Sequence, residues 1–275
     1  MRQGTVVTVR DGEHDLLRGL QRQWSVILAI IFKEIKVRSR TSKFGIMYVL
    51  VEPMVFILAI TAVRWLLRGR EAVDGLHVLI WIPLGVGAFL MVRRAVAKIP
   101  SAISGNDGLL DYPQVKPIDP VIAVFILEMM LTMLGSSLAI FLIWWVVGVH
   151  PAFPQPLEAL GVLAILLVGC FGLSLFLAVY GTFYENIPRT IRFLNRPLIF
   201  ISGVMFPVST LPQEMREYLA WNPLLQFIEY IRLYAAGHPT FPEADLAYGS
   251  FVSIAMLGVG FIAYYANRYR LVQSR

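Results

Sequence analysis

Two carboxylates stand out because they lie inside long apolar stretches of the sequence. They are Glu52, which directly precedes Pro53, and Glu128. An ionisable side chain in such a stretch usually faces protein or a water-filled path, because lipid does not solvate it. Glu128 could accept hydrogen bonds from hydroxyl groups or pair with an arginine, and we favour the structural pair. We expect Glu52 to satisfy backbone groups near a kink at Pro53.

Three arginines follow one another at helical spacing. Arg189, Arg192 and Arg196 are three and four residues apart, so a helix would align them on one face. The planar guanidinium group binds phosphate and carboxylate oxygens in a fork geometry, so the arginines could attract a negatively charged ligand or a lipid phosphate. The alternative, which we favour, is that they only fix the orientation of the chain in a membrane.

The residues that catalysis or nucleotide binding would need are absent from the sequence. The four histidines are far apart, and Cys170 is the single cysteine, so neither a metal cluster nor a disulfide within the chain is expected. The phosphate-binding pattern Gly-x-x-x-x-Gly-Lys-Ser/Thr does not occur. The sequence therefore argues against an enzyme and predicts no cofactor bound by this chain.

The composition places these residues in a membrane protein. The chain is 57% hydrophobic and 15% charged, with a mean hydropathy of +0.66, outside the range of soluble domains. Six apolar stretches could span or nearly span a bilayer, and they lie at about 44–67, 76–99, 121–149, 157–184, 197–211 and 248–267. We expect a short cytoplasmic tail at 1–22 and one transmembrane domain at 23–275.

Lysine and arginine are distributed unevenly between the two sides of these stretches. Nineteen fall on the side of the termini and five on the other side. Cytoplasmic loops carry the excess of Lys and Arg, so both termini are predicted to be cytoplasmic. The net charge of +6 is therefore a topology signal and does not indicate a nucleic-acid partner.

One apolar stretch is too short to cross a bilayer. The stretch 197–207 contains eleven residues and ends at prolines. A helix of that length would rise only about 16 Å, roughly half the hydrocarbon thickness. The following residues, about 208–238, return to an amphipathic pattern that turns at Asn222 and Pro223. We predict a re-entrant helical hairpin here, because irregular backbone at membrane depth must be covered by protein or line a path.

Two segments on the predicted cytoplasmic side have surfaces suited to contacts. Residues 23–42 alternate apolar and basic positions at helical spacing, which is typical of a helix lying in the membrane interface. The loop at about 97–117 combines turn residues with exposed apolar ones, which indicates docking. The contact candidates are Phe32, Lys33, Glu34, Lys36, Ser104, Asn106, Asp107, Leu109, Leu110 and Tyr112. A plain membrane anchor and a loop folded back on its own helices remain the alternatives.

Several strings resemble the permeases of the type-2 ABC exporter family. They are FKEIK at 32–36, YVLVEP at 48–53, LLDYPQVKPID at 109–119, FISGVMFP at 200–207 and WNPL at 221–224. The third looks like the loop after the second span in the branch that exports capsular polysaccharide, and the third and fourth strings together are the most specific part of the resemblance. The resemblance covers about 24–270. It implies an all-α integral membrane fold with six transmembrane helices, an N-terminal interface helix, and a periplasmic hairpin after the fifth span.

The resemblance also implies partners and a cargo. A homodimer would work with a dimer of a separate cytoplasmic ABC ATPase that binds ATP and Mg, and the segments 32–36 and 104–112 would dock on it. A periplasmic co-polymerase or adaptor and an outer-membrane export protein would complete the route through the cell envelope. The localisation would be the bacterial inner membrane, with a polysaccharide or glycolipid as substrate.

Aromatic side chains and the arginines above are candidates for the substrate path, because aromatic rings stack on the C–H faces of sugars. The candidates are Tyr48, Tyr184, Phe200, Phe206, Trp221 and Tyr230, together with Arg189, Arg192 and Arg196. Aromatic residues at the ends of spans also act as plain interfacial anchors. The same architecture could export another cargo, such as O-antigen, teichoic acid or a drug.

Overall fold

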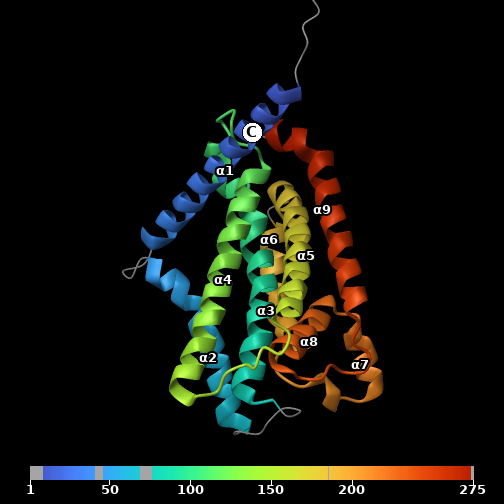
Figure 1. Cartoon of the computed structure of the whole chain (residues 1–275). Coiled ribbons are helices and arrows are strands. Elements are labelled where there is room, and N and C mark those ends of the chain that lie inside the picture. Colours follow the sequence, from blue (N-terminus) through green and yellow to red (C-terminus); the bar gives the residue numbers. More distant parts are fainter. Residues whose placement is uncertain (1–8, 41–45, 69–75, 185, 274–275) are drawn as a thin grey trace, which may run out of the picture.

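The computed structural model describes residues 9–40, 46–68, 76–184 and 186–273 of the chain, and this part is helical without strands. Figure 1 shows the helices as a bundle, with α1 and the C-terminus at one end and α7 and α8 at the other. In chain order the elements are α1 (Val9–Arg40), α2 (Ile46–Arg68), α3 (Val78–Lys98), η1 (Ile99–Ser101), η2 (Ser104–Leu109), α4 (Ile118–Val147), α5 (Pro156–Phe183), α6 (Asn186–Ile201), η3 (Val208–Thr210), α7 (Gln213–Ala220), α8 (Pro223–Ala236) and α9 (Leu246–Gln273).

Five helices of the described chain are long and apolar enough to cross a membrane. They are α2, α3 with η1, α4, α5 and α9. Each coincides with one of the six apolar stretches predicted from the sequence. The all-helical membrane class is therefore confirmed, with five candidate spans in place of six.

The short stretch predicted at 197–211 has different boundaries in the structure. The helix does not run through 197–207; α6 spans Asn186–Ile201 and ends where Gly203 adopts a left-handed conformation with φ of 61°. A Cβ atom at Gly203 would lie 2.5 Å from Leu225, so glycine also permits the close approach of α8. The sequence-based boundaries were wrong because Pro197, read as the start of the helix, lies inside it.

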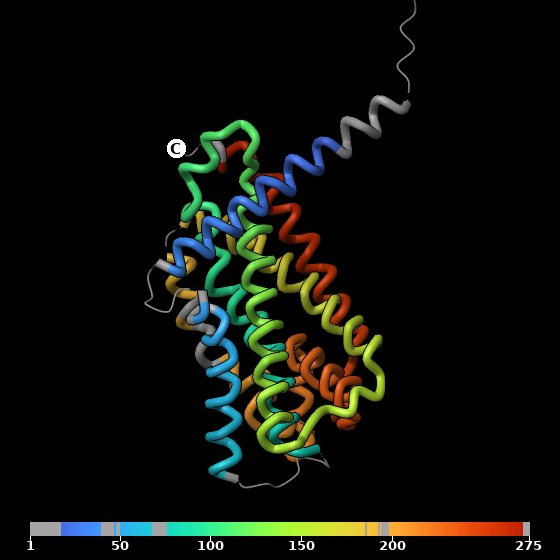
Figure 2. Tube along the Cα trace, turned by 60° about the vertical axis from the view of Figure 1, so that its left-hand side comes forward, coloured from blue at the N-terminus to red at the C-terminus, as the bar shows by residue number. Residues whose placement is uncertain are grey.

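The helix that the sequence predicted for the membrane interface is longer than expected. The sequence suggested about 23–42, with a tail before it, but α1 begins at Val9. Its buried residues Ile27 and Ile30 pack against Ala123 of α4. In both views α1 runs obliquely across the end of the bundle (Figures 1 and 2). This packing accounts for Ile27 and Ile30, which cover the first turns of α4, whereas Trp24 and Phe32 of the same helix stay exposed.

Helices α5 and α9 approach closely because small residues line their contact. A Cβ atom added to Gly172 would lie 2.3 Å from the backbone nitrogen of Leu257, and one added to Gly260 would lie 2.3 Å from the Gly172 carbonyl. Membrane helices gain van der Waals contact where small residues let the backbones meet. The glycines therefore determine how α9 lies on the bundle.

Residues 208–238, predicted as a hairpin, form η3, α7 and α8. The Asn222 side chain accepts a hydrogen bond from the backbone N–H of Leu224, and Pro223 takes the first helical position, so α8 starts here. The Asn222 amide also donates to the Ile201 carbonyl at 3.2 Å, which ties α8 to the end of α6. Helix α8 then packs against α3 and α5 through buried Phe227 and Ile228. It thereby closes one end of the bundle.

Candidate functional site

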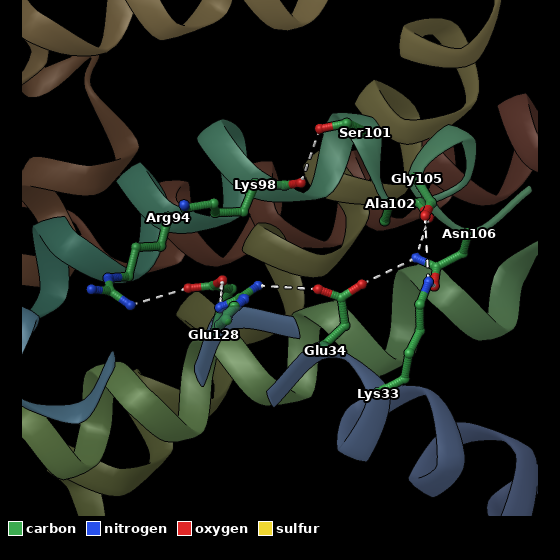
Figure 3. A network of polar contacts seen from close by, with 10 residues as sticks. Lys33, Glu34, Arg94, Lys98, Ser101, Ala102, Gly105, Asn106 and Glu128 are labelled. Carbon is green, nitrogen blue, oxygen red and sulfur yellow. Dashed lines mark hydrogen bonds and ion pairs between the residues drawn. The ribbon is translucent and has the colours of Figure 1, made fainter. Parts of the chain in front are cut away.

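A polar junction joins α1 to the loop after α3. The Lys33 ammonium donates to Oδ1 of Asn106 at 2.7 Å and to the Gly105 carbonyl at 3.5 Å. The Asn106 amide donates to Glu34 at 3.4 Å and to the Ala102 carbonyl at 2.9 Å. Asn106 is 2% exposed, so its side chain is held from both sides. Figure 3 shows these groups converging from α1 and the loop.

Ion pairs extend this junction into the membrane helices. Arg38 lies 3.8 Å from Glu34 and 2.6 Å from Glu128. Arg94 of α3 lies 3.1 Å from the other oxygen of Glu128 and 3.2 Å from Glu52 of α2. Glu128 of α4 is fully buried, so its charge depends on the two guanidinium groups. We call Lys33, Glu34, Arg38, Glu52, Arg94, Asn106 and Glu128 the α1 network.

The α1 network confirms one prediction and corrects another. Glu128 forms the arginine pair that the sequence favoured. Glu52 was expected to satisfy backbone groups near a kink at Pro53, but in the structure its carboxylate forms an ion pair with Arg94. Sequence reasoning missed Arg38 and Arg94 as partners and counted both only as topology charges. The signal that could have found them is the pair of intramembrane carboxylates, since each requires a cation nearby.

The remaining contact candidates divide by exposure. Phe32 is 68% exposed and Tyr112 is 61% exposed, and Lys36, Ser104 and Asp107 are also exposed. Leu109 and Leu110 are half-buried instead. Leu109 packs beside Ile27 and Ile30, and Leu110 packs on the main core. The two leucines thus follow the alternative of a loop folded back on its own helices, because their apolar surface is used within the protomer.

A second polar cluster holds α8 in place at the opposite end. Arg232 is fully buried and donates to Glu229 at 2.8 Å, to the Gly203 carbonyl at 3.1 Å and to the Trp81 carbonyl at 3.3 Å. Its guanidinium lies 3.5 Å from the centre of the Trp81 ring. A Cβ atom at Gly85 would lie 2.3 Å from Nη2 of Arg232. We call these five residues the Arg232 cluster, and it joins α8 to α3 and to the turn after α6.

The candidates for a substrate path do not form one site within the protomer. Tyr184 and Arg189 are exposed near the α5–α6 junction, whereas Trp221 is 74% exposed next to α7. Phe200 is exposed, and Phe206 and Tyr230 are half-buried, with Tyr230 donating to the Ala244 carbonyl. The side chains of Tyr48, Arg192 and Arg196 lie outside the described residues. Their role in transport stays a prediction.

Comparison with known proteins identifies the family. Residues 25–234 match the family model described as ABC-2 type transporter. The chain is 25% identical over 256 residues to the polysialic acid transport protein KpsM of Escherichia coli, covering 93% of this chain and 98% of that protein.

Two further relatives have similar names. The capsule polysaccharide export inner-membrane protein CtrC of Neisseria meningitidis serogroup A is 27% identical over 222 residues, covering 78% of this chain and 81% of the relative. The capsule polysaccharide export inner-membrane protein BexB of Haemophilus influenzae is 23% identical, and 85% of each chain is covered. The family match includes four of the five membrane-length helices and both polar clusters. The chain therefore belongs to the ABC-2 type transporter family, as its sequence strings suggested.

Proposed function

We propose that this chain is the membrane-spanning permease subunit of an ATP-driven exporter, which moves capsular polysaccharide from the cytoplasm to the periplasm. The names of the three relatives support this cargo over O-antigen, teichoic acid or a drug. Their coverage of most of this chain supports transfer of the role as a whole. A lipid-linked form of the polysaccharide is the expected substrate.

The observation that carries the proposal is the α1 network. Lys33 and Glu34 bind the loop after α3, and Arg38 contacts Glu128 in the membrane domain. A partner that pushes on α1 or on this loop therefore moves groups directly bonded to α2, α3 and α4. Because the sequence lacks a phosphate-binding loop, a separate cytoplasmic ATPase dimer would bind ATP and Mg and supply this motion.

The channel is proposed to lie between two protomers, with the α7–α8 segment at its periplasmic end. A long polymer needs a continuous path, and a symmetric dimer provides one along its axis. Periplasmic adaptor and outer-membrane export proteins would receive the polymer. The chain would reside in the inner membrane with both termini cytoplasmic, as the lysine and arginine asymmetry indicates.

Reporter fusions test this orientation. Fusions at His150 and Gly237 should report the periplasm, and a fusion at Gly105 should report the cytoplasm. The first two positions lie at the α8 end of the bundle and the third at the α1 end (Figure 1). A cytoplasmic signal at Gly237 would contradict both the orientation and the placement of the hairpin.

Deletion of the gene in its host, followed by complementation, tests the cargo. Cells without the protein should retain capsular polysaccharide inside, and a plasmid copy should restore it to the surface. Mass analysis of glycolipid co-purified with the chain and its ATPase identifies the substrate directly. Normal surface capsule in the deletion strain, with a different lipid-linked glycan trapped inside, would refute the capsular assignment.

A further inference from the structure

A cleft of about 480 Å³ opens between α2 and α3 at the α1 end of the bundle. Its α2 wall is formed by Glu52, Val55, Phe56 and Ala59 with their neighbours. Its α3 wall is formed by Leu90, Arg93, Arg94, Ala97 and Lys98. Only 22% of the span of α2 is buried within the described protomer, so much of this helix is open to its surroundings.

The cleft has a surplus of positive charge. Three cations, Arg93, Arg94 and Lys98, line the cleft with one carboxylate, Glu52, which attracts Arg93 and forms an ion pair with Arg94. Arg94 is already paired with Glu52 and Glu128, and Glu128 is shared with Arg38. Within the described chain the Lys98 ammonium forms no ion pair, and Figure 3 shows Lys98 on the same stretch of α3 as Arg94. The Arg93 guanidinium lies 4.8 Å from the centre of the Phe56 ring, which keeps it on the cleft wall. The surplus favours an anionic ligand.

The position of the charges along the helices defines the shape of that ligand. The basic residues occupy the last turns of α3, and Glu52 lies in the second turn of α2, so the polar part is at the helix ends. Val55, Phe56, Ala59 and Leu90 continue the cleft toward the middle of the spans. A ligand that fits has an anionic head at the interface and an apolar chain below it.

We propose that this cleft binds the phosphate head of a lipid, with Arg93 and Lys98 contacting the phosphate and the apolar wall holding the first part of an acyl chain. Arginine and lysine near a membrane surface attract anionic headgroups, and the guanidinium group matches phosphate oxygens. A phospholipid of the bilayer and the lipid anchor of an exported glycan have this chemistry in common. The proposal rests on the cleft and does not depend on the cargo.

Native mass spectrometry of the purified full-length chain tests the charge requirement. The chain should retain phosphatidylglycerol in preference to phosphatidylcholine. The double variant Arg93→Gln and Lys98→Gln should weaken this retention on the order of thirtyfold, the effect of two interfacial charges. The matched control Arg18→Gln and Arg22→Gln removes two exposed charges from α1 and should bind as the wild type does. Equal weakening in both double variants would refute the site, because it would indicate diffuse surface attraction.

A steric variant tests the cleft itself. Ala59→Trp fills the apolar half without changing any charge, and Ala59 is exposed, so the helix should fold normally. This variant should lose phosphatidylglycerol although all cations remain, with helical circular dichroism unchanged. Full retention by Ala59→Trp, or a second copy of the chain cross-linked into the cleft in its place, would overturn the proposal.

The source of the bound lipid is identified by purifying the chain from cells with and without glycan synthesis and comparing the lipid masses in the two preparations. The same phospholipid mass in both preparations identifies a membrane lipid. A glycan-bearing lipid found only in the first identifies the anchor of the cargo. Either result supports the phosphate site, and loss of bound lipid in the Arg93→Gln and Lys98→Gln variant must accompany it.

Discussion

Glu128 shows how one residue of the α1 network connects α1 to the membrane-length helices. Its two oxygens face Arg38 and Arg94, which come from α1 and α3. Desolvating three charged groups offsets much of their attraction, so the pairs add little net stability. Removing one member is costly, however, because a charge is then left buried without its partner. The pairs therefore specify the position of α1 more than they stabilise the fold.

Replacing Glu128 tests whether the loss of one partner destabilises the fold although the ion pairs themselves add little net stability. Glu128→Gln leaves Arg94 buried with only Glu52, so we expect a loss of about 3–5 kcal/mol in the free energy of unfolding. Arg38 is partly exposed, so Arg38→Gln should cost less. Unfolding in detergent by denaturant measures both. Glu158→Gln, an exposed carboxylate in the first turn of α5, is the control and should change stability little. Equal effects of Glu128→Gln and Glu158→Gln would contradict the network.

A pH-dependent pair joins α7 to the segment before α9. Arg216 donates two hydrogen bonds to one oxygen of Glu243 and one to the other, at 3.0–3.1 Å, and this hydrogen bonding lowers the pKa of Glu243. A lowered folded-state pKa contributes stability above the ordinary glutamate value of about 4.3, and the contribution is lost as the pH falls through the lowered value. Glu243→Gln should therefore lower the Tm at pH 7 and have less effect at pH 3. A difference in Tm that is independent of pH would refute the pair.

At the scale of elements, the Arg232 cluster predicts that a side chain at residue 85 displaces the Arg232 guanidinium and weakens the docking of α8 on α3. Gly85→Ala should lower stability by about 1–3 kcal/mol, because its Cβ would displace the buried guanidinium. Gly161→Ala is the matched control, since nothing lies within 4 Å of its Cβ and alanine favours the helix. Thermal unfolding of both variants provides the comparison. Equal tolerance of the two substitutions would contradict the close approach of Arg232 to Gly85.

The sequence predicted elements well where apolar stretches are long and uninterrupted. Five stretches became membrane-length helices because some twenty apolar residues have few other solutions. It failed at 197–211, where Pro197 was read as a boundary although α6 continues through it to Ile201. It also failed to pair Arg232 with Trp81, because 151 residues separate them and no periodic pattern records such a contact. Local composition determines spans, whereas buried polar contacts depend on packing.

Leu109 and Leu110 of the loop after α3 are half-buried, whereas Tyr112 of this loop and Phe32 of α1 are exposed, and this difference allows a test of the proposed docking on an ATPase. Phe32→Asp combined with Tyr112→Asp should abolish ATPase binding, because both side chains are exposed and would place charges in an apolar contact. The unfolding temperature should stay unchanged. Leu109→Asp with Leu110→Asp should instead lower the unfolding temperature, since both leucines are half-buried. Co-purification of the ATPase with the first variant would show that this surface is not a docking site.

At the scale of the whole molecule, α3 connects the two polar clusters. Trp81 and Gly85 at its beginning belong to the Arg232 cluster, and Arg94 near its end belongs to the α1 network. Its span is 89% buried, so α3 lies within the bundle along its length. Packed interiors transmit displacement instead of absorbing it. Motion at the α1 end can therefore reach the α8 end through α3.

The proposed dimer places α7 near the symmetry axis, and its surface gives the reason. No residue of α7 is buried, and Met215 and Tyr218 are 56% and 81% exposed on neighbouring turns. Apolar groups exposed outside the membrane-length helices favour contact with another protein. In an isologous dimer, a residue close to the axis lies near the same residue of the other protomer.

Single cysteines at positions 212–221, introduced in a Cys170→Ala background, test this arrangement. Positions 215 and 218 should cross-link between protomers, because a disulfide requires Cα atoms about 4.4–6.8 Å apart and only residues near the axis meet that condition. Val146→Cys on α4 is the control; its side chain is 77% exposed on a membrane-length helix and should not cross-link. Locking α7 should stop export and reduction should restore it, because polymer passing between the protomers needs this end to open. Cross-linking at position 146 without any at 212–221 would place the dimer axis along α4 and refute the assignment of α7 to the channel mouth.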